Sequence, residues 1–380
     1  MSNGRHRPEW QPATPPKDAV FASSVMDGVA GGHDGLPGQS GGGGSRPVAR
    51  RRHLTVPDYV EGVRGGDRTI LARAITLIES NAPGHLAQAQ EVLQALLPYT
   101  GGALRVGITG VPGVGKSTFI EALGVMLCER GHRVAVLAVD PSSSVTRGSI
   151  LGDKTRMEAL ARHPNAYIRP SPTGGSLGGV TRKSRETMLV CEAAGFDVIL
   201  VETVGVGQSE TAVRGMVDFF LLLMLAGAGD ELQGIKKGIM ELADALVITK
   251  ADGENRIRAM LAQADYNQAL HYLAPATPGW KTRARICSAV TGEGIAEIWE
   301  EIERFREVTT ASGVFAERRR QQTRDWLHAL IEDYLRSRFF NHPAVKARLP
   351  AIEAAVVAGT LPVTAGARTL AQAFEEAANG

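Results

Sequence analysis

The segment GITGVPGVGKSTF, residues 107–119, places glycines, a lysine and hydroxyl groups where they could bind phosphate. Gly110, Gly115, Lys116 and Ser117 fit the pattern G-x-x-x-x-G-K-[ST]. Glycines let backbone N–H groups turn toward phosphate oxygens, and a following helix N-terminus adds partial positive charge. The lysine ammonium can reach the outer phosphates, and the serine hydroxyl can ligate Mg²⁺. The pattern therefore predicts a nucleotide site.

The flanking sequence favours this interpretation over a glycine-rich turn without a ligand. The apolar run Leu104–Thr109 predicts a strand directly before the loop. A helical pattern follows as far as Arg130, and Gly131 provides a C-terminal stop. A strand, a glycine loop and a helix in this order are the context that the phosphate-binding motif requires.

A second motif, TKAD at residues 249–252, predicts that the base is guanine. It fits the [NT]-K-x-D pattern of GTP-binding proteins and follows an apolar run, where ligands of open α/β sheets bind. The Asp252 carboxylate can accept hydrogen bonds from guanine N1–H and the 2-amino group, and adenine lacks this pair of donors. Ser288 and Ala289, after the next apolar run, fit the remaining base-contacting turn. The alternative is a capped strand end with a solvated Lys250.

Two acidic residues end apolar runs on the same predicted sheet edge. Asp140 follows RVAVLAV, and Glu202 follows DVILV. Carboxylates at this edge would hold Mg²⁺ or its waters, because Mg²⁺ takes few direct carboxylates and keeps several waters. The alternative for each residue is a helix N-cap or a surface acid.

The stretch ETVG, residues 202–205, occupies the place of a D-x-x-G switch, in which the glycine N–H contacts the γ-phosphate. Ras-like proteins carry a glutamine directly after that glycine, whereas Val206 stands there in this chain and Gln208 comes later. We therefore expect GTP hydrolysis to be slow or to need help. Residues 140–157 and 227–238 are glycine-containing polar loops after predicted strands, and we interpret both as nucleotide-sensing switches rather than ordinary surface loops.

The wider pattern predicts an α/β fold. Short apolar runs alternate with helical stretches between residues 103 and 310: LRVGIT, RVAVLAV, DVILVET, FFLLLMLA, DALVITK and ARICSAV. Runs that are apolar on both faces and separated by helices indicate a parallel sheet covered on both sides. Residues 51–102 read as a helical extension, in which Asp67 can cap a helix. Residues 1–50 contain GLPGQSGGGGSR and are expected to be a disordered tail.

Residues 311–380 are predicted to form a C-terminal helical arm. Its apolar stripe consists of Trp326, Leu327, Leu330, Ile331, Tyr334 and Leu335. We expect this stripe to pack against a second copy in a two-fold dimer. The alternative is that it packs on the α/β domain of its own chain.

Composition narrows the class of protein further. The 380 residues carry 42 Lys and Arg against 40 Asp and Glu, a net charge of +2, so bulk binding to nucleic acid or membrane is not expected. No apolar run approaches the length of a membrane span, roughly 18 residues. The 3 cysteines form no C-x-x-C pair, which favours a reducing compartment, the cytoplasm of a bacterium or the mitochondrial matrix of a eukaryote.

Five segments together resemble the MeaB/ArgK/MMAA family of P-loop GTPases. They are GVPGVGKSTFIEALG, AVDPSSS, GSILGDKTRM, ETVGVGQSE and GAGDELQGIKKGI, and the similarity covers roughly residues 57–380. The resemblance implies a SIMIBI-class P-loop NTPase with helical extensions at both ends that forms homodimers. It also implies a chaperone that binds GTP and GDP with Mg²⁺ and serves adenosylcobalamin-dependent acyl-CoA mutases, chiefly methylmalonyl-CoA mutase.

The resemblance also implies roles for individual residues. Phosphate and nucleotide contacts are expected at Gly110, Gly113, Val114, Gly115, Lys116, Ser117, Thr118 and Gly205, and base contacts at Thr249, Lys250, Asp252, Ser288 and Ala289. The magnesium shell is expected at Ser117, Asp140, Asp153 and Glu202, and catalysis at Lys116, Asp153, Glu202 and the switch residue Lys236, with Asp230 as a second switch residue. The chain departs from the family at Arg147, Ala226 and Thr249, where glycine, proline and asparagine are common.

Other functions fit the sequence less well. A nickel-insertion GTPase of the same class would need histidine tracts or paired cysteines, and a transport-system kinase would need a kinase motif. The D-x-H-x-x-G cobalamin motif does not occur in the sequence, so we expect the cofactor to belong to the partner mutase.

Overall fold

The computed structural model describes residues 54–139, 157–170, 177–203, 209–227 and 238–378. The predicted tail lies outside the described residues, and so does most of each predicted switch loop. The same holds for Asp140, Arg147, Asp153, Gly205, Asp230 and Lys236.

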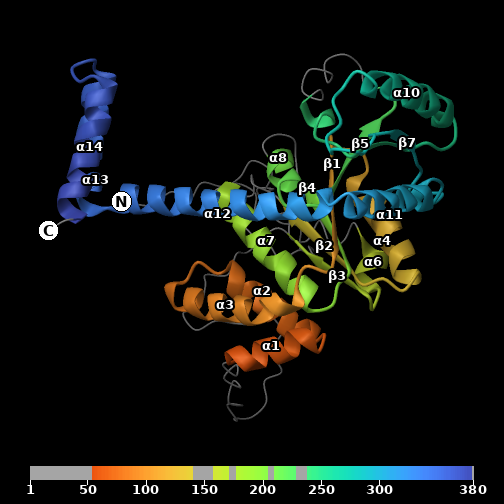
Figure 1. The fold of residues 1–380 in the computed structure, drawn as a ribbon, viewed down its shortest axis with the longest axis horizontal. Helices are drawn as coiled ribbons and strands as arrows, with labels where there is room; N and C mark the ends of the chain where they lie inside the picture. The colour runs from red at the N-terminus through yellow and green to blue at the C-terminus, as the bar shows by residue number, and fades with distance from the viewer. Residues whose placement is uncertain (1–53, 140–156, 171–176, 204–208, 228–237, 379–380) are drawn as a thin grey trace, which may run out of the picture. The chain divides into compact units, whose positions relative to one another are not determined.

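A seven-stranded sheet forms the centre of the unit that begins at Leu54, and every neighbouring pair of strands is parallel. The strand order is β3-β2-β4-β1-β5-β6-β7 (Figure 1). The strands are β1 Leu104–Gly110, β2 Val134–Val139, β3 Ala166–Arg169, β4 Val198–Thr203, β5 Phe219–Leu225, β6 Ala245–Thr249 and β7 Ala284–Ile286. The predicted α/β class with a parallel central sheet is confirmed.

Helices precede, separate and follow these strands. Those before or between them are α1 Val56–Arg64, α2 Arg68–Glu79, α3 Pro83–Leu96, η1 Leu97–Tyr99, α4 Lys116–Glu129, α6 Glu158–Arg162, α7 Leu177–Ala193, α8 Ser209–Arg214 and α10 Asn255–Leu270. Those after the sheet are α11 Ile295–Ala311, α12 Val314–Asn341, α13 Pro343–Val357 and α14 Val363–Ala378.

The core has a layer on each face of the sheet, as the alternation along β2 shows. Val134 and Val136 pack with α4 and α11, whereas Ala135 and Leu137 pack with α2, α3 and α7 (Figure 1). Every residue of β2 and β4 is buried. Strands that are covered on both faces must be apolar throughout, which is why the sequence shows continuous apolar runs rather than alternating ones.

The edge strand β3 was not predicted from the sequence. It has 4 residues, AYIR, of which the last 2 are only half-buried. It pairs with β2 from Val134 to Leu137 on a single side. A short edge strand needs few apolar residues, so it lacks the continuous run that marks its neighbours.

The predicted cap at Asp67 is confirmed at the start of α2. Its carboxylate Oδ1 accepts hydrogen bonds from the backbone N–H groups of Thr69 at 2.8 Å and Ile70 at 3.1 Å. The cap satisfies donors that the first turn of a helix leaves unpaired. Helix α2 then buries its apolar face in the core layer that also contains residues of α7.

The 28-residue helix α12 joins the sheet domain at its N-terminal half. The Arg319 guanidinium donates to both carboxylate oxygens of Asp218, at 2.7 and 2.6 Å, and to the Gly101 and Ala103 carbonyls, each at 2.6 Å. The predicted stripe lies farther along this helix, and its members Leu327, Ile331, Tyr334 and Leu335 are exposed in the single chain. Among the described residues, no helix is long and apolar enough to cross a membrane.

Candidate functional site

The loop between β1 and α4 needs glycine at three positions. Gly110, Gly113 and Gly115 have positive φ angles of 154°, 77° and 96°. A Cβ at Gly110 would also lie 2.6 Å from the Leu223 carbonyl oxygen. Side chains other than hydrogen are therefore excluded where the chain turns sharply toward the start of α4. Val114 is buried inside the loop, and Thr118 is exposed in the first turn of α4.

The Lys116 side chain reaches back into the loop that precedes it. Its ammonium Nζ donates to the Gly110 carbonyl over 2.8 Å and to the Val111 carbonyl over 3.4 Å. Burial lowers the pKa of Lys116, while the nearby carboxylates of Glu202 and Glu210 raise it. The lysine is thus a partly desolvated cation at the carboxyl edge of the sheet, where a negatively charged ligand is favoured.

The structure brings Ser117 and Glu202 together. The Ser117 hydroxyl donates to Glu202 Oε1 over 3.0 Å. The two strands behind them are neighbours, with Ile108 paired to Glu202, and the Thr203 hydroxyl donates to the Thr109 hydroxyl over 2.8 Å. The Glu202 carboxylate is 4% exposed, so it is held in a fixed position.

These oxygen atoms fit Mg²⁺, a hard cation that prefers a hydroxyl, one or two carboxylates, phosphates and water. Among the described residues, no group of three or more His, Cys, Asp and Glu could hold a metal ion by itself. Ser117 and Glu202 would therefore be the described residues that hold such an ion.

Glu210 is a site residue that was not predicted. It is 2% exposed in the first turn of α8, and its charge acts on Lys116. Its place in the segment ETVGVGQSE, beside Glu202, was the available signal. The sequence alone did not indicate that α8 turns this carboxylate inward.

The predicted guanine motif contacts the phosphate loop directly. The Thr249 hydroxyl donates to the Val114 carbonyl over 2.6 Å, and Thr249 itself is buried. Lys250 follows in the left-handed region at φ 57°, and its side chain is exposed. Its Cε lies 4.0 Å from where a Cβ on Gly115 would stand, so the lysine stem runs beside the loop.

Asp252 and Ser288 are also brought together. The Ser288 hydroxyl donates to Asp252 Oδ2 over 2.5 Å, and the Ala251 N–H donates to the Cys287 carbonyl over 3.0 Å. Ser288 is fully buried and Ala289 is half-buried. The serine therefore orients the aspartate carboxylate, a positioning role that spacing alone did not reveal.

Comparisons with known proteins cover both motifs. A family profile described as "Methylmalonyl Co-A mutase-associated GTPase MeaB" matches residues 71–344. A probable GTPase of Mycobacterium tuberculosis is 59% identical over 307 residues, which cover 81% of this chain and 91% of that protein. A mitochondrial methylmalonic aciduria type A homolog of Mus musculus is 47% identical over 327 residues, which cover 83% of this chain and 78% of that protein. The crystal structure of an LAO/AO transport system kinase is similar with a TM-score of 0.69 and 40% identity, covering 85% of this chain and 99% of the other.

Proposed function

The chain belongs to the MeaB family of GTPases, and from this premise we propose that it is a GTP-dependent chaperone for an adenosylcobalamin-dependent acyl-CoA mutase. The observation that carries the GTP-binding part of the proposal is the contact between Thr249 and Val114, which brings the guanine motif and the phosphate loop together. The chaperone part rests on the family description. Methylmalonyl-CoA mutase is the first partner to test, because the matching family description names it.

In this proposal, the nucleotide is held by residues from four segments. The phosphates contact Gly110, Gly113, Val114, Gly115, Lys116, Ser117, Thr118 and Gly205, and the base contacts Thr249, Lys250, Asp252, Ser288 and Ala289. Ser117 and Glu202 hold Mg²⁺ together with Asp140 and Asp153. When bound, Mg²⁺ neutralises charge on the phosphate oxygens.

Hydrolysis in this proposal is slow until the partner acts. Lys116 and Glu202 are fixed by contacts of the described residues, whereas Lys236 and Asp153 lie outside them. We assign Lys236 to a switch that the mutase orders, which would add a cation at the γ-phosphate. An added cation of this kind raises turnover by about 10³-fold or more.

Assembly and location form the remaining part of the proposal. The GTPase domain comprises residues 103–310, and helical extensions precede it at 51–102 and follow it at 311–380. Two copies of the chain form a homodimer in which the apolar stripe on α12 is the interface. Cobalamin belongs to the mutase and is not bound by this chain. The protein shares the compartment of its partner, the cytoplasm of a bacterium or the mitochondrial matrix of a eukaryote.

The proposal is tested with the full chain and purified methylmalonyl-CoA mutase. We expect co-elution in size-exclusion chromatography with a non-hydrolysable GTP analogue, and faster single-turnover GTP hydrolysis when the mutase is added. Lys236→Ala should lose most of this acceleration and keep GTP binding. Lys237 is the fallback, because adjacent residues point differently and the sequence does not choose the inward one. If Lys236→Ala and Lys237→Ala both respond to the mutase as the parent does, this loop is not the catalytic switch. Absence of both co-elution and acceleration, with isobutyryl-CoA mutase as well, would overturn the chaperone role while leaving the GTPase assignment intact.

A further inference from the structure

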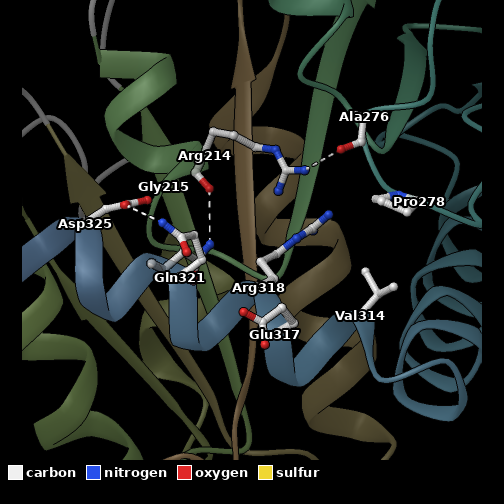
Figure 2. A pocket seen from close by; sticks show the side chains of 10 residues that line it. Arg214, Gly215, Ala276, Pro278, Val314, Glu317, Arg318, Gln321 and Asp325 are labelled. Carbon is white, nitrogen blue, oxygen red and sulfur yellow. Dashed lines mark hydrogen bonds between the residues drawn. The ribbon is translucent and has the colours of Figure 1, made fainter.

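A second pocket lies at the opposite edge of the sheet from the phosphate loop. It has a volume of about 430 Å³ and lies between the end of α8, the 276–278 segment and the first turns of α12 (Figure 2). Arg214 ends α8 shortly before β5 begins at Phe219, so the pocket adjoins the amino end of that strand. Gly110, in contrast, marks the carboxyl end of the neighbouring parallel strand β1. The pocket is therefore separate from the nucleotide site.

Two guanidinium groups extend into this pocket from different elements. Arg214 and Arg318 have side chains that are only 14% and 13% exposed. Figure 2 shows both guanidinium groups pointing to the same side, toward Ala276 and Pro278. Mostly desolvated arginines that converge in this way form a planar set of donors suited to an oxyanion.

The two arginines differ in how well their N–H donors are hydrogen-bonded within the protein. Arg318 donates to the Asp218 carbonyl and to the Thr277 hydroxyl, and its Nη1 lies 3.4 Å from Asp244 Oδ2. Within the described part of the chain, the Arg214 guanidinium contacts Asp244 Oδ1 and the Ala276 carbonyl, each at the long distance of 3.5 Å. An arginine has five N–H donors, and both of these contacts use Nη2, so Nε and Nη1 of Arg214 have donor capacity left for a ligand.

At the inner end of the pocket, two arginines contact one carboxylate. Asp244 is fully buried and is the carboxylate that faces both arginines, while Asp218 is engaged by the bidentate Arg319. Burial lowers the pKa of Arg214, Asp244 raises it, the positive charge of Arg318 lowers it, and the Asp218 carboxylate raises it. Asp244 thus contacts two guanidinium groups, and Asp218 acts on Arg214 without contacting it while it is bound by Arg319, so Arg214 keeps part of its positive charge for a ligand.

Two acidic residues, Glu317 and Asp325, line the rim of the pocket and differ in their partners. The Glu317 carboxylate lies 2.6 Å from Arg320 and 3.7 Å from Arg324, and it is half exposed. Asp325 accepts a hydrogen bond from the Gln321 side chain over 2.8 Å. Glu317 is therefore balanced by arginines of its own helix, whereas Asp325 keeps its charge and lies on the side of the pocket away from the Arg214 guanidinium (Figure 2).

The rest of the wall selects the body of the ligand. Ala276, Pro278 and Val314 present aliphatic surface beside the guanidinium groups (Figure 2). Small-molecule sites combine apolar walls with a few convergent polar groups, and their volumes are about 300–1,000 Å³. We propose that this pocket binds a small organic anion, in which one carboxylate or phosphoryl group contacts Arg214 and a short aliphatic body contacts the apolar wall.

The test is saturation-transfer difference NMR on the full chain saturated with GDP and Mg²⁺, so that the phosphate loop is occupied. Butyrate, propylphosphonate and the neutral butyramide are titrated separately, because they share a three-carbon body. We expect saturable signals for an anion and none for butyramide. Binding of butyrate alone identifies a carboxylate ligand, and binding of propylphosphonate alone identifies a phosphoryl ligand.

Substitutions in the pocket test whether the NMR signal arises from a ligand bound there. Arg214→Gln should weaken anion binding about tenfold or more, since a hydrogen bond to a charged group is lost. It should fold, because Asp244 keeps its bonds from the Phe220 N–H at 2.9 Å, Thr277 and Arg318. Val314→Trp fills the pocket from its apolar side and should also abolish binding, which decides the matter if Arg214→Gln does not fold. Arg336→Gln, which removes an exposed arginine of the same helix, should bind as the parent does.

Three results would overturn the proposal. They are the absence of a saturable signal for either anion, equal binding of butyramide, and unchanged affinity in both Arg214→Gln and Val314→Trp.

Discussion

The Ser117 hydroxyl and the Glu202 carboxylate lie 3.0 Å apart although 85 residues separate them in the sequence. The contact arises because β1 and β4 are parallel neighbours, so the turn after β1 and the end of β4 meet at the same edge. A hydroxyl and a buried carboxylate at this distance form two corners of a site for a hard cation. The relationship therefore ties the strand order of the sheet to the Mg²⁺ site that we propose.

Replacing Glu202 with glutamine should raise the Mg²⁺ concentration needed for half-maximal GTP hydrolysis by about 10- to 100-fold. Glutamine keeps the shape and can still accept the Ser117 hydrogen bond, but it removes the negative charge that faces the ion. The measurement is a Mg²⁺ titration of steady-state turnover. Glu129→Gln, at the exposed end of α4, serves as the control. An unchanged Mg²⁺ dependence in Glu202→Gln would remove this residue from the metal shell.

Lys116→Ala should abolish turnover and weaken GTP more than GDP, because the ammonium serves the outer phosphates. The fold should survive, since the hydrogen-bond partners of Nζ are carbonyls within its own loop and not core groups. Calorimetry with both nucleotides, together with thermal melting, measures these effects. Lys281→Ala, at an exposed lysine, is the control for loss of one charge. If Lys116→Ala hydrolyses GTP at the parent rate, the loop has another function.

Asp252→Asn should exchange guanine preference for xanthine preference. Xanthine carries an oxygen where guanine has its 2-amino group, so an amide donor replaces a carboxylate acceptor at the same place. The Ser288 hydroxyl, which lies 2.5 Å from Asp252 Oδ2, holds either side chain in position. Competition binding with GTP, XTP and ATP measures the exchange, and Asp265→Asn on the exposed face of α10 is the control. Equal affinity of the parent chain for ATP and GTP would contradict the guanine assignment.

Sequence reasoning recovered the sheet where burial leaves a strong pattern. Strands such as β2 and β4 are buried along their whole length, so each appears as a continuous apolar run. The phosphate loop was equally visible, because its glycines occupy backbone conformations that other residues avoid. The edge strand β3 is covered by one neighbour only and leaves no comparable run.

Contacts between distant segments could not be predicted from spacing. The hydrogen bond from Thr249 to Val114 joins residues 135 positions apart, and that from Ser288 to Asp252 joins residues 36 positions apart. Each depends on strand order, which is a property of the packed sheet and not of any local segment. The pair Arg214 and Arg318 was missed for the same reason, since an arginine in a helix usually indicates a solvated face.

All three cysteines should resist thiol reagents in the folded protein. Cys128, Cys191 and Cys287 are free and buried, and burial raises the pKa of each thiol, that of Cys287 to about 12. At pH 8 the thiolate fraction of Cys287 is thus about 1,000-fold below that of an ordinary thiol. The pKa of Cys287 is higher in the folded chain than in the unfolded chain, so the unfolded thiol ionises first as the pH rises. The contribution of this thiol to the free energy of unfolding is therefore lost between pH 9 and about 12. Reaction with 5,5′-dithiobis(2-nitrobenzoate) should be slow until guanidinium is added, and rapid labelling of the native chain would contradict the buried assignment.

The contacts of α12 with the sheet domain decide how its role in a homodimer can be tested. Cutting the chain before α12 would remove Arg319 and leave the buried carboxylate of Asp218 unpaired, so a monomer obtained in this way could simply be destabilised. The exposed stripe begins beyond these contacts, at Leu327. Substituting the stripe alone separates assembly from folding.

Leu327→Ser, Ile331→Ser and Leu335→Ser combined should convert a dimer into a monomer while thermal stability at low concentration stays nearly unchanged. These side chains are 56%, 45% and 56% exposed in the single chain, so serine at each position leaves no cavity in the core. Serine at these positions would remove the apolar contacts with the second copy. Each Å² of apolar surface buried in such an interface contributes about 25 cal/mol to the free energy of association. Multi-angle light scattering across a concentration series measures the change, with Ile257→Ser on α10 as a control for loss of an exposed apolar residue. If the triple variant remains a dimer, the stripe does not form the two-fold interface.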